Sequence, residues 1–138
     1  MKPQAFDYAR PDSAEEAVAL LHEAGEDARI LAGGQSLMAV LNLRLAQPSV
    51  LIDISRVPDL NYVRSTGSHL AIGAAATQGS VEWRATLATE VPLLAQAFPH
   101  ISHFQIRNRG TVCGSVAHAD PSAELPLALL ALDGEVVL

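Results

Sequence analysis

Apolar residues recur at helical spacing over residues 14–24 and predict an amphipathic helix there. Val18, Leu20 and Leu21 fall on one side of it, so we expect this side to face the core. A capping box precedes the predicted helix and a glycine suited to its C-terminal end follows it: Ser13, Glu16 and Gly25. The cap signals agree with the periodicity, and the helix is the clearest element of the chain.

Short apolar runs around this helix predict strands. They cover residues 6–8, 29–32 and 50–54, and we expect the run at 29–32 to be buried. Residues 37–45 are apolar and tolerate a helix, although Asn42 weakens that prediction. The order of strand, helix, strand, loop and strand indicates a small α/β lobe over residues 1–58.

The second half, residues 59–138, is predicted as an α+β lobe that begins with a hairpin and continues with helices. A loop-rich stretch interrupts the helices, and the last residues indicate a turn that enters a strand. A chain that stops inside a strand is expected either to be a fragment or to pair that strand at an edge. The two hairpin strands are predicted at 62–65 and 69–73, and the helices at 77–84, 91–98 and 122–132. The loop-rich stretch covers residues 101–119, and the final strand covers residues 135–138.

Composition indicates a folded globular protein. Of 138 residues, 49% are hydrophobic and 17% charged, which argues against intrinsic disorder. The net charge of −6 argues against binding to nucleic acid or to an anionic membrane. With neither a secretory signal nor an 18-residue apolar run, we expect a cytoplasmic protein. The single cysteine, Cys113, excludes an internal disulfide and a cysteine-rich metal site.

The first candidate site is a glycine pair that directly follows a predicted strand. Gly33 and Gly34 let the backbone approach a ligand closely, and successive N–H groups there can form a nest for pyrophosphate. Ser36 can add a hydroxyl. The segment matches neither the Rossmann nor the P-loop pattern, and its spacing alone favours a tight turn without a ligand.

A second glycine-containing segment lies in the predicted second lobe, at residues 107–115. Thr111 and Ser115 can donate hydrogen bonds, and Gly114 permits close approach. The segment could also be a turn whose arginines only solvate a surface. Two donor-rich segments, one in each lobe, are nevertheless suited to hold a dinucleotide pyrophosphate between them.

Carboxylates follow the second segment. Asp120 or Glu124 could accept hydrogen bonds from ribose or ribityl hydroxyls, or could simply mark the start of a helix. The spacing of His100, His103 and His118 fits no standard zinc pattern, so we predict no metal site. A nucleophilic role for Cys113 is disfavoured, since a cysteine beside glycines can simply fill a small volume.

Two motifs together, AGGQS at 32–36 and RNRGTVCGSVAHADPSAE at 107–124, resemble the FAD-binding medium subunit of molybdenum hydroxylases. That family includes carbon monoxide dehydrogenase and xanthine dehydrogenase. The resemblance covers nearly the whole chain, and it implies a two-lobed FAD-binding PCMH-type fold of the vanillyl-alcohol-oxidase kind with an incomplete second lobe. The resemblance also implies that the subunit continues well past residue 138, with a further part that is expected to finish that lobe and add flavin-ring contacts.

The resemblance implies specific FAD contacts. Ile101 matches a position that packs near the flavin, Glu124 a carboxylate that binds FAD hydroxyls, and Asp120 is a weaker candidate for that role. The family's second segment usually has a glycine pair whose first member is here Cys113, which would cost stability if that position needs a positive φ. The two pyrophosphate segments comprise Ala32, Gly33, Gly34, Gln35 and Ser36, and Thr111, Cys113, Gly114 and Ser115.

The function implied by the resemblance is electron transfer, with no catalytic residue and no metal on this chain. A molybdopterin-binding large subunit would hydroxylate the substrate, and a small subunit with 2Fe-2S clusters would carry electrons to FAD. The acceptor would be NAD, a quinone or oxygen. Two alternatives remain open: a self-standing FAD-dependent oxidase, and a non-catalytic assembly module whose glycine segments are only turns.

Overall fold

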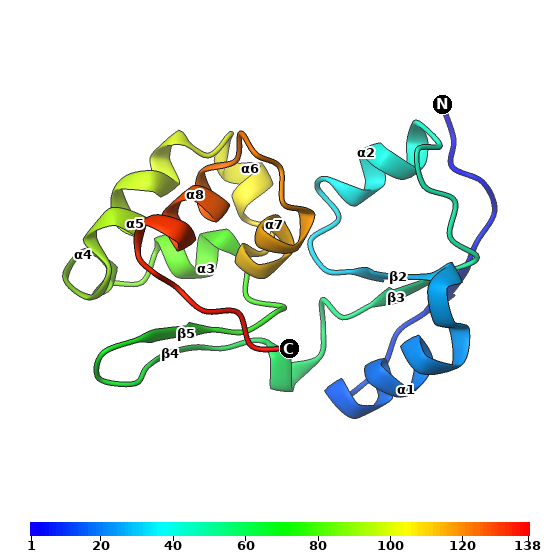
Figure 1. The fold of residues 1–138 in the computed structure, drawn as a ribbon, viewed down its shortest axis with the longest axis horizontal. Coiled ribbons are helices and arrows are strands. Elements are labelled where there is room, and N and C mark those ends of the chain that lie inside the picture. The colour runs from blue at the N-terminus through cyan, green and yellow to red at the C-terminus, as the bar shows by residue number, and fades with distance from the viewer.

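Three short strands form a parallel sheet in the N-terminal part of the computed structural model, which describes residues 1–138. The central strand, β3 (Val50–Asp53), pairs with β1 (Asp7–Ala9) on one side and β2 (Ala28–Leu31) on the other. The carboxyl ends of the three strands therefore meet at one edge of the sheet (Figure 1). The expectation of a buried strand at 29–32 is wrong, because β2 is an edge strand with an exposed middle.

Helix α1 (Ala14–Ala24) has the predicted bounds and caps. The Ser13 hydroxyl accepts a hydrogen bond from the Glu16 N–H at 3.1 Å, and Gly25 follows at φ 60°. The predicted buried face is confirmed only for Leu20, which packs against the core, because Val18 is 67% and Leu21 38% exposed whereas Ala17 is only 5% exposed. Small side chains let α1 pack closely on β2 and β3, with Leu20 partly buried beside them and Val18 and Leu21 outside.

The C-terminal part lies beside the sheet and consists of a hairpin and helices (Figure 1). The hairpin, with β4 (Val63–Ser65) antiparallel to β5 (Leu70–Ile72), is confirmed. Three of the helices that follow agree with the predicted ones in position but are shorter, a fourth at 87–90 was not predicted, and α2 of the first part ends three residues early. Their bounds are α2 (Leu37–Asn42), α3 (Gln78–Glu82), α4 (Leu87–Glu90), α5 (Pro92–Ala97) and α8 (Glu124–Ala131).

Two further helices replace the predicted loop-rich stretch at 101–119. These are α6 (Phe104–Arg107) and α7 (Val112–His118), and only short connections flank them. Glycines suggested a loop here, but Gly114 lies inside α7, where tertiary packing outweighs its weak helix propensity. The predicted final strand is also absent, because residues 135–138 pair with no other strand.

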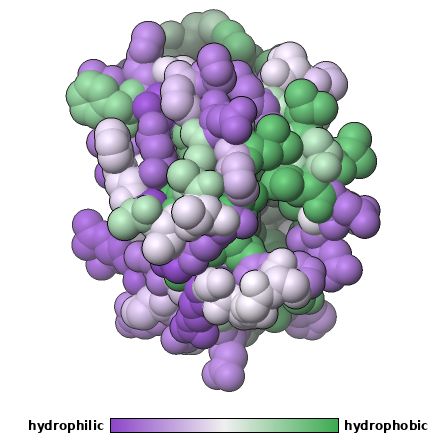
Figure 2. Space-filling view, turned by 90° about the vertical axis from the view of Figure 1, so that its left-hand side faces the viewer, coloured by the Kyte–Doolittle hydropathy of each residue, from purple (hydrophilic) through white to green (hydrophobic).

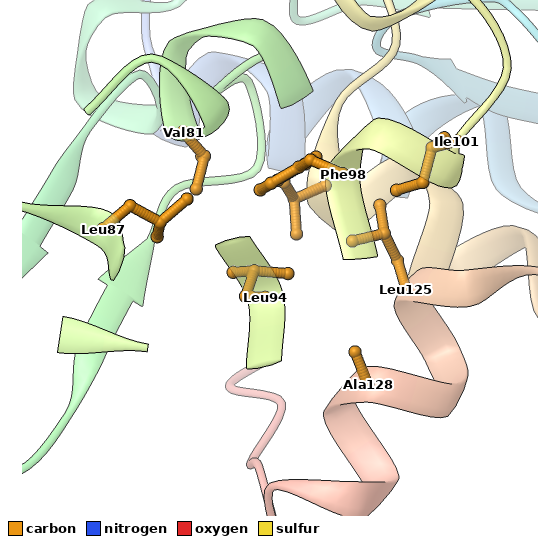
Figure 3. Packing of buried hydrophobic residues seen from close by; sticks show 8 residues of the cluster. Val81, Leu87, Leu94, Phe98, Ile101, Leu125 and Ala128 are labelled. Atoms are coloured by element: carbon orange, nitrogen blue, oxygen red, sulfur yellow. The ribbon is translucent and has the colours of Figure 1, made fainter. Parts of the chain in front are cut away.

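Each part has its own buried cluster. The larger one contains eight residues, and Figure 3 shows Phe98 between side chains of α5 and α8, with Ile101 and Leu125 beside it. The smaller cluster has five buried residues between α1 and the sheet, including Ile52 and Val57. Leu60 and Ala74 also pack against the smaller cluster, so the chain beyond residue 58 contributes to it.

The surface mixes hydrophilic side chains with groups of hydrophobic ones. Figure 2 shows this on the end of the molecule that carries α4. Among the exposed apolar residues, Trp83 is 73% and Leu130 is 79% exposed. No helix has both the length and the apolar character that crossing a membrane requires.

Candidate functional site

Gly33 is the point at which the two glycine-containing segments meet. A Cβ atom at this position would lie 2.4 Å from the carbonyl oxygen of Arg109 and 2.6 Å from Cα of Gly110. Both are main-chain atoms that cannot rotate away, so no side chain fits here. The fold thus brings together two segments that are more than 70 residues apart in the sequence (Figure 1).

The first segment offers a row of unused backbone donors. The N–H groups of the four residues from Gly33 to Ser36 donate to no protein acceptor. Gly34 has φ 73°, the left-handed conformation that lets successive N–H groups turn toward one side. The Ser36 side chain is exposed and makes no capping bond, so its hydroxyl is available.

The second segment is a capped helix start rather than the predicted loop. Thr111 is 3% exposed, and its Oγ1 accepts a hydrogen bond from the Gly114 N–H at 3.0 Å. A main-chain hydrogen bond anchors the second segment to the start of α3, since the Gln78 N–H donates to the Gly110 carbonyl at 2.7 Å. Gly114 is tightly placed, because its Cβ would lie 2.5 Å from the Thr111 hydroxyl and 3.8 Å from Cβ of Ala32.

Cys113 points away from the glycine pair. Its Sγ lies 3.4 Å from the carbonyl oxygen of Ile72 in β5, and burial raises the pKa of the thiol. The thiol is therefore protonated near neutral pH. Its backbone is helical, with no positive φ, so the strain expected from losing the family's glycine does not arise. The Cys113 N–H, which lies in the first turn of α7, also donates to no protein acceptor.

Ile101, Asp120 and Glu124 lie elsewhere in the C-terminal part, before and after the second segment. Ile101 is 9% exposed and belongs to the larger buried cluster. Glu124 is half-buried and begins α8. Asp120 is exposed; its Oδ1 accepts bonds from the Ser122 N–H at 2.9 Å and the Ser122 hydroxyl at 2.7 Å, which lower its pKa. No hydrogen bond joins these three residues to residues 33–36 or 111–115.

Arg107 has a structural role that the sequence did not indicate. It is 8% exposed, and its guanidinium donates two hydrogen bonds to Glu82 at 2.7 and 2.9 Å. A third bond, at 2.8 Å, reaches the carbonyl of Ile101. The Glu82 carboxylate raises the pKa of Arg107. The pair ties α3, α6 and the turn at Ile101 together, and no local spacing connects partners 25 residues apart.

Of the hollows on the surface, two differ in how they relate to the candidate site. The larger, about 550 Å³, is formed by α6 and its flanks and contains none of the predicted residues. The smaller, about 280 Å³, lies beside the contact between the glycine segments, with Ala32 and Thr111 in its wall. Only the smaller hollow is therefore linked to the candidate site.

Residues 4–138 match the family model described as the FAD binding domain in molybdopterin dehydrogenase. The sheet and the helices are thus those of an FAD-binding domain with an α+β fold. The chain belongs to the family of FAD-binding domains of molybdopterin dehydrogenases. The resemblance and the α+β class expected from the sequence are both confirmed.

Individual proteins are also similar to this chain in sequence. The chain is 50% identical over 136 residues to the 6-hydroxypseudooxynicotine dehydrogenase complex subunit alpha of Paenarthrobacter nicotinovorans, covering 99% of this chain and 46% of that protein. It is 47% identical over 136 residues to the nicotine 6-hydroxylase medium subunit of the same organism, covering 99% and 48%. The chain therefore spans about half the length of these relatives.

A solved structure of carbon monoxide dehydrogenase from Hydrogenophaga pseudoflava, lacking the Mo-pyranopterin moiety of its cofactor, has the same fold. The TM-score is 0.87 at 45% sequence identity, and the match covers 91% of this chain and 44% of that one. The likeness extends over both parts of the present structure.

Proposed function

We propose that this chain binds FAD, with the diphosphate held between residues 33–36 and residues 111–115. The observation that carries the proposal is the main-chain contact at Gly33, which sets the unused N–H groups of one segment beside the helix start of the other. Backbone N–H groups arranged in this way are suited to phosphate oxygens. Membership of an FAD-binding family supports the choice of dinucleotide.

The chain's own residues would act by binding and orienting. The Ser36 and Ser115 hydroxyls would donate to phosphate oxygens alongside the backbone of Ala32, Gln35 and Cys113. Glu124, with Asp120 as the weaker candidate, would accept hydrogen bonds from ribose or ribityl hydroxyls. Ile101 would contribute apolar packing near the flavin from the rim of its buried cluster. Bound FAD would supply the redox chemistry, while the protein supplies position and electrostatics.

The same proposal covers the whole protein. Residues 1–58 and 59–138 would form two lobes of a PCMH-type domain of the vanillyl-alcohol-oxidase kind, with FAD between them and further chain completing the second lobe. The protein would be the flavin subunit of a molybdopterin-dependent dehydrogenase, and would pass electrons from 2Fe-2S clusters on a small subunit to NAD, a quinone or oxygen. A molybdopterin-binding large subunit would select the substrate.

A titration of the purified chain with FAD, followed by flavin fluorescence, tests the site. We expect saturable binding that Ser36→Ala weakens several-fold, because one hydrogen bond to a charged group contributes about 1.5–3 kcal/mol when buried and less when exposed. Ser65→Ala, which removes a hydroxyl from the distant hairpin, is the control and should bind as the unaltered chain does.

The outcomes separate the site from the function. Binding that is equal in the Ser36→Ala and unaltered chains would move the diphosphate away from this segment. Absence of FAD binding, both in this chain and in a longer one that extends beyond Leu138, would overturn the FAD function itself.

A further inference from the structure

Three of the eight arginines have no partner in the protein. Arg84 and Arg107 bind carboxylates, Arg29 and Arg44 bind backbone carbonyls, and Arg64 lies over the ring of Tyr62 at 4.6 Å. The remaining three, Arg10, Arg56 and Arg109, make no hydrogen bond or ion pair through their guanidinium groups. They all line the same hollow of about 280 Å³, the one beside the glycine contact.

This arginine cleft lies where the two parts of the molecule face each other. Arg10 follows β1 and Arg56 follows β3, so both come from the edge at which the carboxyl ends of the parallel strands meet. Arg109 and Asn108 come from the other part, just before α7. Crevices outside the carboxyl ends of parallel strands are frequent ligand sites.

The cleft carries a net positive charge because its three guanidinium groups outnumber its one carboxylate, which already accepts hydrogen bonds from neutral donors. Asp53 accepts a hydrogen bond from the Tyr8 hydroxyl and another from the Ser55 N–H at 2.8 Å. The lining thus carries three guanidinium groups against one carboxylate, in a protein whose net charge is −6. Cations gathered on an acidic protein, with no internal acceptor, mark a place for an external anion.

We propose that the arginine cleft binds a compact oxyanion, the phosphate or carboxylate group of a small molecule, at a site separate from the FAD diphosphate site. Guanidinium groups present paired donors that match the two oxygens of such a group. The Asn108 amide and the Thr77 hydroxyl add neutral polar groups to the lining. A volume of about 280 Å³ suits a small ligand, since drug-sized pockets begin at about 300 Å³.

The proposed separation from FAD rests on which residues face the cleft. Ala32 and Thr111 contribute to its wall, but residues 33–36 and 113–115 do not. An anion in the cleft would therefore contact the arginines of its lining rather than the row of unused N–H groups at residues 33–36. This inference does not depend on FAD binding, and one set of variants tests the two independently.

Calorimetric titration of the purified chain with inorganic phosphate, and separately with malonate, tests the proposal at constant ionic strength. We expect one saturable site, weakened about tenfold or more by Arg10→Gln, Arg56→Gln or Arg109→Gln, as expected for losing a hydrogen bond to a charged group. The matched control is Arg64→Gln, which removes the same charge outside the cleft. All four arginines are exposed, so the variants should fold, and melting curves check this.

Phosphate binding without malonate binding would identify the ligand as a phosphate compound; the reverse would identify a carboxylate. Failure of both anions to bind below about 10 mM would overturn the proposal, as would equal weakening by Arg64→Gln. FAD affinity is measured on the same variants and should not change. If FAD competes with phosphate and the cleft variants weaken both, the cleft is part of the FAD site; the separate site is then wrong while FAD binding stands.

Discussion

At the scale of single residues, the two neighbouring glycines of the first segment serve different purposes. Gly34 takes a positive φ of 73°, a conformation in which an L residue is strained. Gly33 has no such φ, but any Cβ there would collide with main-chain atoms of the second segment. One glycine shapes the row of N–H groups, and the other permits the two segments to touch.

Gly33→Ala should therefore destabilise the protein by about 1–3 kcal/mol, the usual cost of overpacking a closely fitted contact. Chemical denaturation measures this. Gly67→Ala is the control, since Gly67 also resists substitution through a positive φ of 81° but has open space around it. Its cost should be only the conformational penalty of about 1 kcal/mol. A Gly33→Ala variant as stable as the unaltered chain would contradict the contact.

Asp53 links a residue-scale contact to the pH dependence of stability. Burial raises the pKa of this carboxyl, but hydrogen bonds from Tyr8 and Ser55 outweigh burial and hold the pKa below its usual value. A carboxyl with a lowered folded-state pKa stabilises the fold above its unfolded pKa of about 3.9. That stabilisation is lost as the pH falls through the folded-state pKa.

Tyr8→Phe should lower the free energy of unfolding at pH 7 by about 1 kcal/mol or less, because the pair is partly exposed. The difference between the two proteins should shrink below pH 4, where Asp53 becomes protonated in both. Urea denaturation at pH 7 and pH 3 measures it. A difference that grows as the pH falls would show that Tyr8 does not stabilise the ionised carboxylate.

At the scale of elements, Thr111 joins the start of α7 to the start of α3. Its hydroxyl caps α7, and its backbone forms an antiparallel bridge with Thr77, which caps α3 through the Ser80 N–H at 3.1 Å. The two helix starts are thus fixed relative to each other next to Gly33. A loop could not hold the donors of the second segment as firmly as this pair of caps.

Thr111→Ala should destabilise the protein by about 1–2 kcal/mol through loss of the cap, whereas Thr111→Ser keeps the hydroxyl and should cost less. Thermal melting of the two variants compares them, and FAD titration should give the same order of affinities. Equal stability of the alanine and serine variants would show that the hydroxyl does not cap α7.

Local signals predicted some elements well and others poorly, for physical reasons. The limits of α1 follow from its caps, which act within a few residues. Its buried face depends on the sheet, which local periodicity does not describe, and small residues face the sheet instead of Val18. The helices α6 and α7 were missed because Arg107 and Thr111 draw their support from partners far along the chain. The glycine segments were identified as a candidate site, but only the fold shows that they touch.

At the scale of the whole molecule, the N-terminal and C-terminal parts each have a buried cluster, and main-chain atoms bring the two parts into contact at Gly33. Eight buried residues form the C-terminal cluster and five the N-terminal one, and Gly33 contacts the other part through main-chain atoms. A ligand that bridges this junction would stabilise both parts together. FAD, whose diphosphate would lie at the junction and whose two ends would reach outward from it, is such a ligand.

Saturating FAD should therefore raise the melting temperature of the chain in one cooperative transition. At a free concentration one hundred times the dissociation constant, linkage gives about 2.7 kcal/mol of added stability. FMN lacks the adenosine and the second phosphate, so at equal concentration it should stabilise the chain less. Calorimetry with each flavin makes the comparison. Equal stabilisation by FMN and FAD would show that the junction recognises one phosphate only, and the diphosphate assignment to residues 33–36 and 111–115 would then be wrong.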